Sequence, residues 1–212
     1  GSDVVYLMIS GINYTSGTDM WQTAIDLAEN YKAAVLKSGV KNVVNLSSVG
    51  ADNANAGILY SYHFAEDALN SLESVNVVHI RPVGFYSNLF ADMQSLKAQR
   101  ILFSPISADI PQGWVSPVDI ADVAYALISH TPAGKSTKFV VSDWATSNDW
   151  LNALAENDIE AKFQQIPVEA LAENMKKIGF HENTANGFAQ LYRAGENADE
   201  FYASLRATDY HL

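Results

Sequence analysis

The sequence predicts an α/β protein: a Rossmann-like parallel sheet with flanking helices and a small, mostly helical C-terminal portion. Three observations lead to this fold class. Strand-like runs alternate with helical patterns over residues 1–146, as in consecutive βαβ units. The runs are rich in β-branched residues and apolar on both faces, which is typical of parallel strands covered on both sides. From Ser147 onward the pattern is mostly that of amphipathic helices.

Four strands are expected, at residues 4–9, 41–48, 75–82 and 138–143. Between the first two, a helix begins after a cap at Thr18 or Asp19 and runs to about Ser38, where Gly39 stops it. Further helices are expected at about 62–72 and 85–100, and Asp119 is expected to open another with an apolar face. The C-terminal helices are predicted at 148–157, 167–179 and 183–196.

Composition narrows the classes of function. The 212-residue chain has a net charge of −11 with its acidic residues dispersed, which argues against nucleic acid and anionic membrane surfaces as partners. No apolar run is long enough to span a membrane. There is no cysteine, and the five histidines are scattered, so no metal site is predicted. A cytoplasmic protein with a small-molecule substrate is expected, and a homodimer is left open.

Three separated motifs point to one family. A strand ends in Ser47-Ser48; a second ends in Arg81-Pro82, with Phe85 and Asn88 soon after; and a helix start carries Val115, Asp119, Ile120 and Ala121. In this order and spacing they resemble the NmrA-like family, atypical members of the short-chain dehydrogenase/reductase superfamily. The resemblance extends from about Asp3 to Asp143. It implies a Rossmann-like NAD(P)-binding domain at 1–146 and a helical substrate or lid region at 147–212.

One family feature has no counterpart. Members begin with a strand and a G-x-x-G-x-x-G loop that holds the cofactor pyrophosphate. Residues 4–9 instead resemble the family's fourth strand, so roughly 60 residues, two strand–helix units, are expected to be missing from the front. The resemblance implies NADP or NAD as cofactor, with NADP favoured.

Ligands of open parallel sheets bind outside the carboxyl ends of the strands. Three such tips are predicted, and by the resemblance they line the nucleotide pocket, although each also has a plainer interpretation as a strand exit, loop cap or turn. The candidate cofactor-binding residues are Ser10, Gly11, Ser47, Ser48, Pro82, Val83, Gly84 and Phe85. Tyr86 and Asn88, with Phe85, are candidate substrate contacts, since aromatic walls with one amide suit a flat ring such as a quinone.

The catalytic candidates are Tyr62 and His63. Classical reductases of the superfamily pair a tyrosine with a lysine four residues on, which lowers the tyrosine pKa. Here Glu66 stands at that place, and a carboxylate would raise the pKa of Tyr62 instead. His63 could donate the proton in its stead, or could simply be a surface histidine at a helix start. Glu66 is expected to cap or pair on its helix, and Arg81 to pair with a carboxylate such as Asp119 or to brace the turn.

The motifs and the family resemblance leave three functions open. The first is an NmrA-like NAD(P)H-dependent reductase acting on a quinone or small carbonyl compound. The second is a non-catalytic redox sensor that binds dinucleotide and acts through a protein partner, which the missing lysine favours. The third, a sugar-nucleotide epimerase or dehydratase, is weakened because those enzymes rely on the Tyr-x-x-x-Lys pair. Trp114 is expected at the seam between the two regions, with the C-terminal helices forming a lid.

Overall fold

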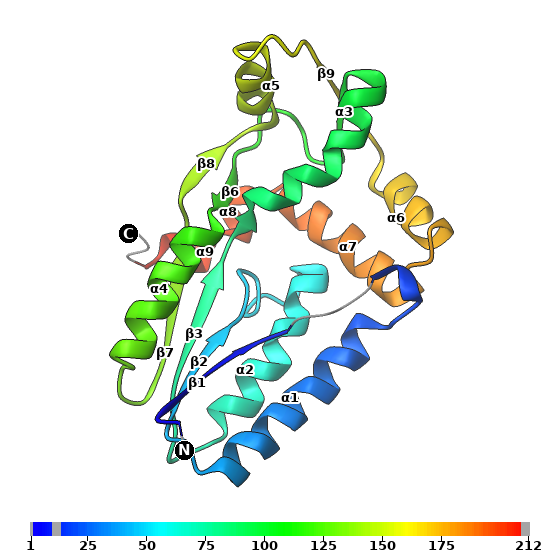
Figure 1. Ribbon diagram of the computed structural model, residues 1–212. Coiled ribbons are helices and arrows are strands. Elements are labelled where there is room, and N and C mark those ends of the chain that lie inside the picture. Colours follow the sequence, from blue (N-terminus) through cyan, green and yellow to red (C-terminus); the bar gives the residue numbers. More distant parts are fainter. Residues whose placement is uncertain (1, 10–13, 209–212) are drawn as a thin grey trace.

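The computed structural model describes residues 2–9 and 14–208. Its main sheet has four parallel strands in the order β1-β2-β3-β7. Each predicted strand has its counterpart, and the parallel Rossmann-like arrangement is confirmed (Figure 1). The bounds are β1 Val4–Met8, β2 Asn42–Leu46, β3 Asn76–Pro82 and β7 Lys135–Val140.

Helices cover both faces of this sheet. Helices α1 (Met20–Ser38) and α2 (His63–Asn70) lie together on one face, and α4 (Pro117–Ser129) lies on the other (Figure 1). Successive strand residues point to opposite faces. Val43 and Val77 therefore pack in the cluster with Val35 of α1, whereas Val44 and Val78 pack in the cluster with Ile120 of α4. This double burial explains why the strands are apolar throughout.

The predicted limits of α1 are confirmed. The Asp19 side chain accepts a hydrogen bond from the backbone N–H of Trp21, and Gly39, at φ 71°, donates its N–H to the carbonyl of Val35. The predicted opening of α4 by Asp119 is wrong. The hydroxyl of Ser116 caps that helix by accepting from the N–H of Val118, while Asp119 accepts a hydrogen bond from Ser142.

Two short helical segments differ from the prediction. The helix expected from residue 62 is preceded by a 3-10 helix, η2 (Gly57–Tyr62). The helix expected at 85–100 begins as the 3-10 helix η3 (Tyr86–Asp92) and becomes α3 (Met93–Gln99). Arg100, in the left-handed conformation at φ 57°, ends it. A further 3-10 turn, η1 (Tyr14–Ser16), precedes α1.

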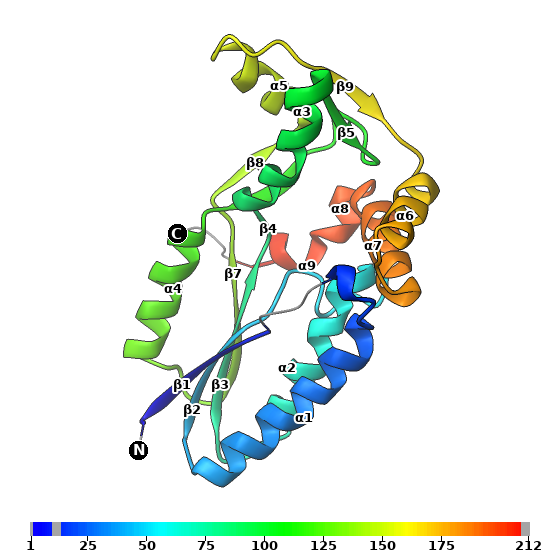
Figure 2. The same ribbon diagram turned by 45° about the vertical axis from the view of Figure 1, so that its right-hand side comes forward.

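Small sheets that the sequence did not predict stand above the main sheet. Strand β6 (Gln112–Val115) pairs parallel with β4 (Gly84–Phe85) and antiparallel with β8 (Asp143–Ala145). Strand β5 (Ile101–Ser104) pairs with β9 (Lys162–Gln165), which joins the middle of the chain to its C-terminal part (Figure 2). The strand predicted at 138–143 is thus divided between β7 and β8.

The C-terminal part is helical, as predicted, and it returns to the main sheet. Its helices are α5 (Ser147–Ala155), α6 (Val168–Lys177), α7 (Glu182–Gly195), α8 (Ala198–Phe201) and α9 (Ala203–Arg206). Phe201, Tyr202 and Leu205 belong to the same buried cluster as Val44 and Val78 of the sheet. The two regions are therefore joined by shared core, and a functional division at residue 146 stays a prediction.

Candidate functional site

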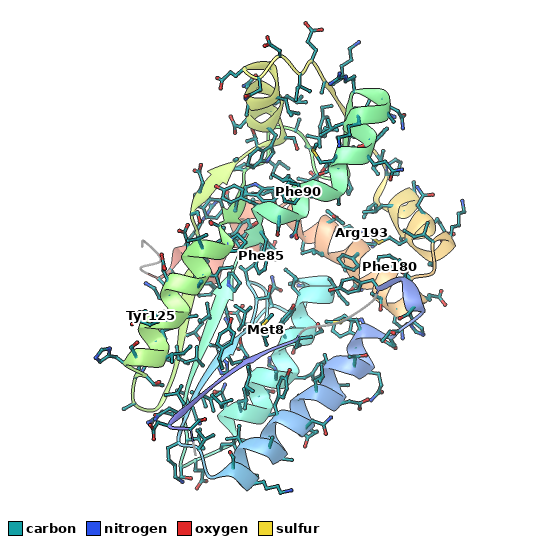
Figure 3. All side chains as sticks on the ribbon, viewed as in Figure 1. Met8, Phe85, Phe90, Tyr125, Phe180 and Arg193 are labelled. Carbon is teal, nitrogen blue, oxygen red and sulfur yellow. The ribbon has the colours of Figure 1, made fainter. Side chains whose placement is uncertain are left out.

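A cleft of about 680 Å³ opens at the carboxyl ends of β1, β2 and β3. We call it the rim cleft. Of the candidate cofactor-binding residues, Ser10 and Gly11 lie outside the described residues. The other six all line the rim cleft, namely Ser47, Ser48, Pro82, Val83, Gly84 and Phe85. Figure 3 shows Phe85 and a further lining side chain, Met8, near the centre of the molecule.

Strand register brings these tips together. Met8 pairs with Leu46, and Leu46 with Ile80, so β1 and β2 end at the same level and β3 ends only two residues beyond it, at Pro82. Beyond the strand ends, the N–H of Ser47 donates to the carbonyl of Ile80 at 2.7 Å, and that of Val49 to the carbonyl of Pro82 at 2.9 Å. The two loops therefore leave the sheet side by side and form one continuous wall.

The opposite wall comes from η1, η2 and α7. Tyr14, Tyr62, Phe188 and Tyr192 line it. Burial raises the pKa of Tyr62 to about 12, and the neighbouring Tyr14 adds to the effect. The direction agrees with the sequence expectation, but the expected cause does not, because the Glu66 carboxylate binds other groups. Tyr62 therefore holds its proton firmly at neutral pH and presents a hydroxyl without the activation that a lysine provides.

Glu66 belongs to a buried ionic network under the rim cleft. Its carboxylate accepts hydrogen bonds from Ser47 Oγ at 2.5 Å and from Arg81 Nε at 2.9 Å and Nη2 at 2.6 Å. Arg81 also pairs with Asp52 at 2.6 Å. Ser47 and Glu66 are only 3% and 4% exposed. The Ser47 hydroxyl is thus committed to Glu66, so Ser47 contributes to the wall of the cleft rather than a free reactive group.

This network confirms that Arg81 pairs with a carboxylate and corrects two details. The partners of Arg81 are Glu66 and Asp52, not Asp119, because its strand position turns its side chain toward α2 and the loop after β2. Glu66 neither caps nor pairs on its own helix. A charged residue within the apolar run 75–82 was the one available sign that a buried partner existed, but the sequence could not identify that partner.

Of the remaining predicted site residues, one lines the rim cleft and two lie outside its lining. Asn88 lines the rim cleft. His63 is not among the lining residues: its ring stacks on Tyr60 at 4.7 Å, and its Nε2 lies 3.0 Å from Asp67. Tyr86 also lies outside the lining and stacks on Trp114, with ring centroids 6.2 Å apart. Tyr86 therefore supports a wall instead of forming it.

The lining of the rim cleft, within the described residues, contains no charged side chain. Hydroxyl, amide and aromatic groups of this kind suit the nicotinamide and ribose of a dinucleotide, and the volume of the cleft lies within the general range of ligand pockets. They do not suit its pyrophosphate. The first turn of α1 reaches the cleft at Met20, but its N–H groups already donate to Thr184 and Asp19. The described part of the chain thus fits half of the cofactor.

A second cavity of about 290 Å³ adjoins the rim cleft. We call it the aromatic pocket. Trp114 of β6 and Trp150 of α5 form one wall, with ring centroids 5.4 Å apart at 88°. Trp114 therefore stands where the sheet region meets the C-terminal helices. Asn88 and Tyr192 line both cavities. Asp92 and Tyr192, which sequence reasoning missed, face this pocket from η3 and α7.

Two further classes of site are absent from the described residues. No group of three or more histidine, cysteine or acidic side chains is placed to hold a metal ion. No helix there is both long and apolar enough to cross a membrane.

No family model and no curated protein matches the sequence. Solved structures do match. A nucleoside-diphosphate-sugar epimerase from Staphylococcus aureus aligns with 100% of this chain and 75% of its own, at a TM-score of 0.73 and 18% identity. An NADPH-dependent quinone oxidoreductase from Escherichia coli, complexed with NADPH, aligns with 100% of this chain and 74% of its own, at 0.70 and 16%.

A triphenylmethane reductase from Citrobacter sp., complexed with NADP(H), aligns with 96% of this chain and 72% of its own, at a TM-score of 0.69 and 17% identity. At such identities the likeness concerns the fold alone. The chain spans about three-quarters of the length of each of these structures. Its α/β fold is the Rossmann-like fold of these nicotinamide-dependent reductases and epimerase-like proteins.

Proposed function

We propose that the chain is an NmrA-like NAD(P)-binding protein that reduces a quinone or small carbonyl compound. The observation that carries the proposal is the rim cleft: six predicted cofactor residues from two strand ends line one uncharged cavity at the carboxyl edge of a parallel sheet. NADP is favoured over NAD by the family resemblance, and the cytoplasm is the proposed location. Two structural neighbours are described as complexes with NADPH and NADP(H), which agrees with this preference.

The described residues have separate tasks in this proposal. Ser48, Val83, Gly84 and Phe85 would hold the nicotinamide and its ribose against the strand ends. When bound, the reduced nicotinamide supplies a hydride. Tyr62 orients the ligand through its protonated hydroxyl, and the Glu66–Arg81 pair fixes the floor beneath it. The phosphate groups require donors beyond those that line the cleft.

A non-catalytic redox sensor is the second candidate, and one observation favours it. Among the described residues no cation lines the cleft beside Tyr62, and burial raises the pKa of Tyr62 to about 12, so this part of the wall does not provide the proton relay of classical reductases. The epimerase alternative is weaker for the same reason: Glu66, at the position of the required lysine, is held by Ser47 and Arg81.

The test is to titrate the intact protein with NADPH and NADH, and then to add quinones and aldehydes while following the absorbance of the reduced nicotinamide. We expect saturable binding, tighter for NADPH, and loss of absorbance with at least one quinone. Ser48→Phe should weaken nucleotide binding by about tenfold or more by filling the cleft. Binding without any oxidation would favour the sensor. No binding of either nucleotide would contradict both functions.

A further inference from the structure

The proposed reduction needs a proton as well as a hydride. The titratable side chains that line the rim cleft, among the described residues, are Tyr14, Tyr62 and Tyr192, and burial raises the pKa of all three. The aromatic pocket offers another source. Its titratable lining residues, among those described, are Asp92, Tyr192 and Tyr202, and no basic side chain lines it. The hydroxyl of Tyr202 is occupied, since it accepts from the N–H of Gly113 at 3.1 Å and contacts Gln112 at 3.3 Å.

Asp92 and Tyr192 are differently placed. Among the described residues, neither the Asp92 carboxyl group nor the Tyr192 hydroxyl forms a hydrogen bond or an ion pair. They lie close enough that the charge of Asp92 adds to the effect of burial in raising the pKa of Tyr192. Burial also raises the pKa of Asp92. A carboxyl group that is half-buried, without a cation and open to a cavity keeps its proton more readily than a surface aspartate.

The pocket also has a specific shape. The indole N–H of Trp150 is buried and has no hydrogen-bond partner among the described residues. Tyr86 supports the Trp114 ring in a near-parallel stack at 12°. A flat ring can lie against such an aromatic wall, and a volume of about 290 Å³ corresponds to a small ligand.

We propose that Asp92 is a catalytic residue, the proton donor to a quinone bound in the aromatic pocket, with Tyr192 hydrogen-bonding the same oxygen. This rests on the proposed function and names the acid that it lacks. The hydride bonds to one quinone oxygen, the ring electrons shift toward the opposite oxygen, and an O–H bond forms there as the O–H bond of Asp92 breaks. One hydride and one proton thus convert the quinone to the hydroquinone. Solvent returns the proton to the Asp92 carboxylate.

The position of the pocket supports this assignment. The aromatic pocket shares Val49, Gly84, Asn88 and Tyr192 with the rim cleft. A ring bound in one cavity would therefore lie directly beside a ligand bound in the other cavity. Asp92 lines the aromatic pocket but not the rim cleft. A nucleotide and an acceptor could therefore be bound at the same time, with the acid on the acceptor's side.

The first experiment needs no nucleotide. Quenching of tryptophan fluorescence by 1,4-naphthoquinone should saturate in the native chain, because Trp114 and Trp150 line the pocket. Ser147→Phe, which fills only this pocket, should weaken quenching by about tenfold or more, while Ser48→Phe, which fills only the rim cleft, should leave it unchanged. Equal quenching in the two variants would overturn the assignment of the pocket.

The second experiment isolates Asp92. Quinone affinity should fall roughly three- to tenfold as pH rises and Asp92 ionises, because a donor is lost. In Asp92→Asn, whose amide donates at every pH, affinity should not change with pH. With nucleotide present, Asp92→Asn should reduce quinone turnover about a hundredfold or more without weakening quinone binding. Asp122→Asn, an exposed position on α4, is the control.

The outcomes distinguish the two proposals. If nucleotide does not bind but quinone affinity follows Asp92, the proposed function fails and the acceptor site stands. If nucleotide binds and the native chain and Asp92→Asn share one pH dependence, or turnover of the variant stays within about threefold, Asp92 is not the donor.

Discussion

At the scale of single residues, the most consequential interaction is the ion pair between Glu66 and Arg81. Burial alone would raise the pKa of Glu66, but hydrogen bonds and charge from Arg81, with the Ser47 hydroxyl, outweigh it and hold the pKa below its usual value. The carboxylate is therefore ionised at neutral pH. It ties α2 to β3 and, through Arg81 and Asp52, to the loop after β2.

Removing one member of this pair leaves a buried charge. Glu66→Ala should lower the free energy of unfolding by roughly 3–5 kcal/mol, toward the lower end because Asp52 still contacts Arg81. Urea unfolding measures this change. The adjacent Asp67, 67% exposed and paired only with His63, is the matched control, and its replacement by Ala should change stability by no more than about 0.5 kcal/mol. Similar losses in both variants would show that the buried pair contributes little.

At the scale of elements, the rim cleft depends on how closely α7 approaches η2. Gly57 has φ 58°, and a Cβ atom there would lie 2.2 Å from the carbonyl oxygen of Gly187 and 2.4 Å from the backbone nitrogen of Leu191. Both neighbours are backbone atoms, which cannot rotate away. The contact places Phe188 and Tyr192 of α7 opposite the strand tips.

Gly57→Ala should therefore destabilise the protein by about 3 kcal/mol or more, since steric overlap adds to backbone strain. Gly39→Ala is the matched comparison: φ is 71° there too, but nothing lies within 4 Å of the added Cβ atom. Only the strain, about 1–2 kcal/mol, should be lost. Thermal unfolding of the two variants separates the contributions, and equal losses would contradict a close helix contact at Gly57.

Element by element, the main sheet could be predicted because each long run carries its own signal. Residues 4–9 and 75–82 are apolar and β-branched, and α1 has Asp19 and Gly39 at its ends. Strands β4 and β8, with two and three residues, are too short to show a period. Strand β9 is mostly exposed and forms only because β5 lies beside it.

The candidate site could also be predicted only in part. The rim cleft could be predicted, because the parallel register of the strands brings their carboxyl ends close together. The partner of Arg81 could not be predicted, because the sequence has 24 acidic residues and only the packed structure shows which of them lie beside it. Asp92 and Tyr192 are 100 positions apart, on a 3-10 segment and a helix whose meeting depends on the whole C-terminal part returning to the sheet.

At the scale of the whole molecule, a buried histidine links stability to pH. His79 lies in β3, where Nδ1 is 3.1 Å from Asn45 and Nε2 is 3.0 Å from Asn70. Burial lowers its pKa; Arg81 and Lys135 act in the same direction, and Glu66 opposes them. In the folded protein the ring is therefore neutral at pH values where the unfolded chain already takes up a proton.

The stabilisation from a neutral His79 is complete above about pH 6.5, the usual pKa of an unfolded histidine, and is lost as pH falls toward the lower folded value. The free energy of unfolding should thus decrease more between about pH 7.5 and about pH 5.5 in the native chain than in His79→Gln. His130→Gln, an exposed position, should keep the native decrease. Parallel curves for all three would contradict a role for His79.

The central claim is that the strand tips form a nicotinamide-nucleotide site, and backbone amide shift mapping with NADPH tests it most directly. We predict that the largest shifts fall on Ser47, Ser48 and Val49 and on Val83, Gly84 and Phe85, the two tips that line the rim cleft. Shifts concentrated instead around Arg100 and Lys162, which line a separate cleft of about 990 Å³, or no shifts at all, would contradict the account.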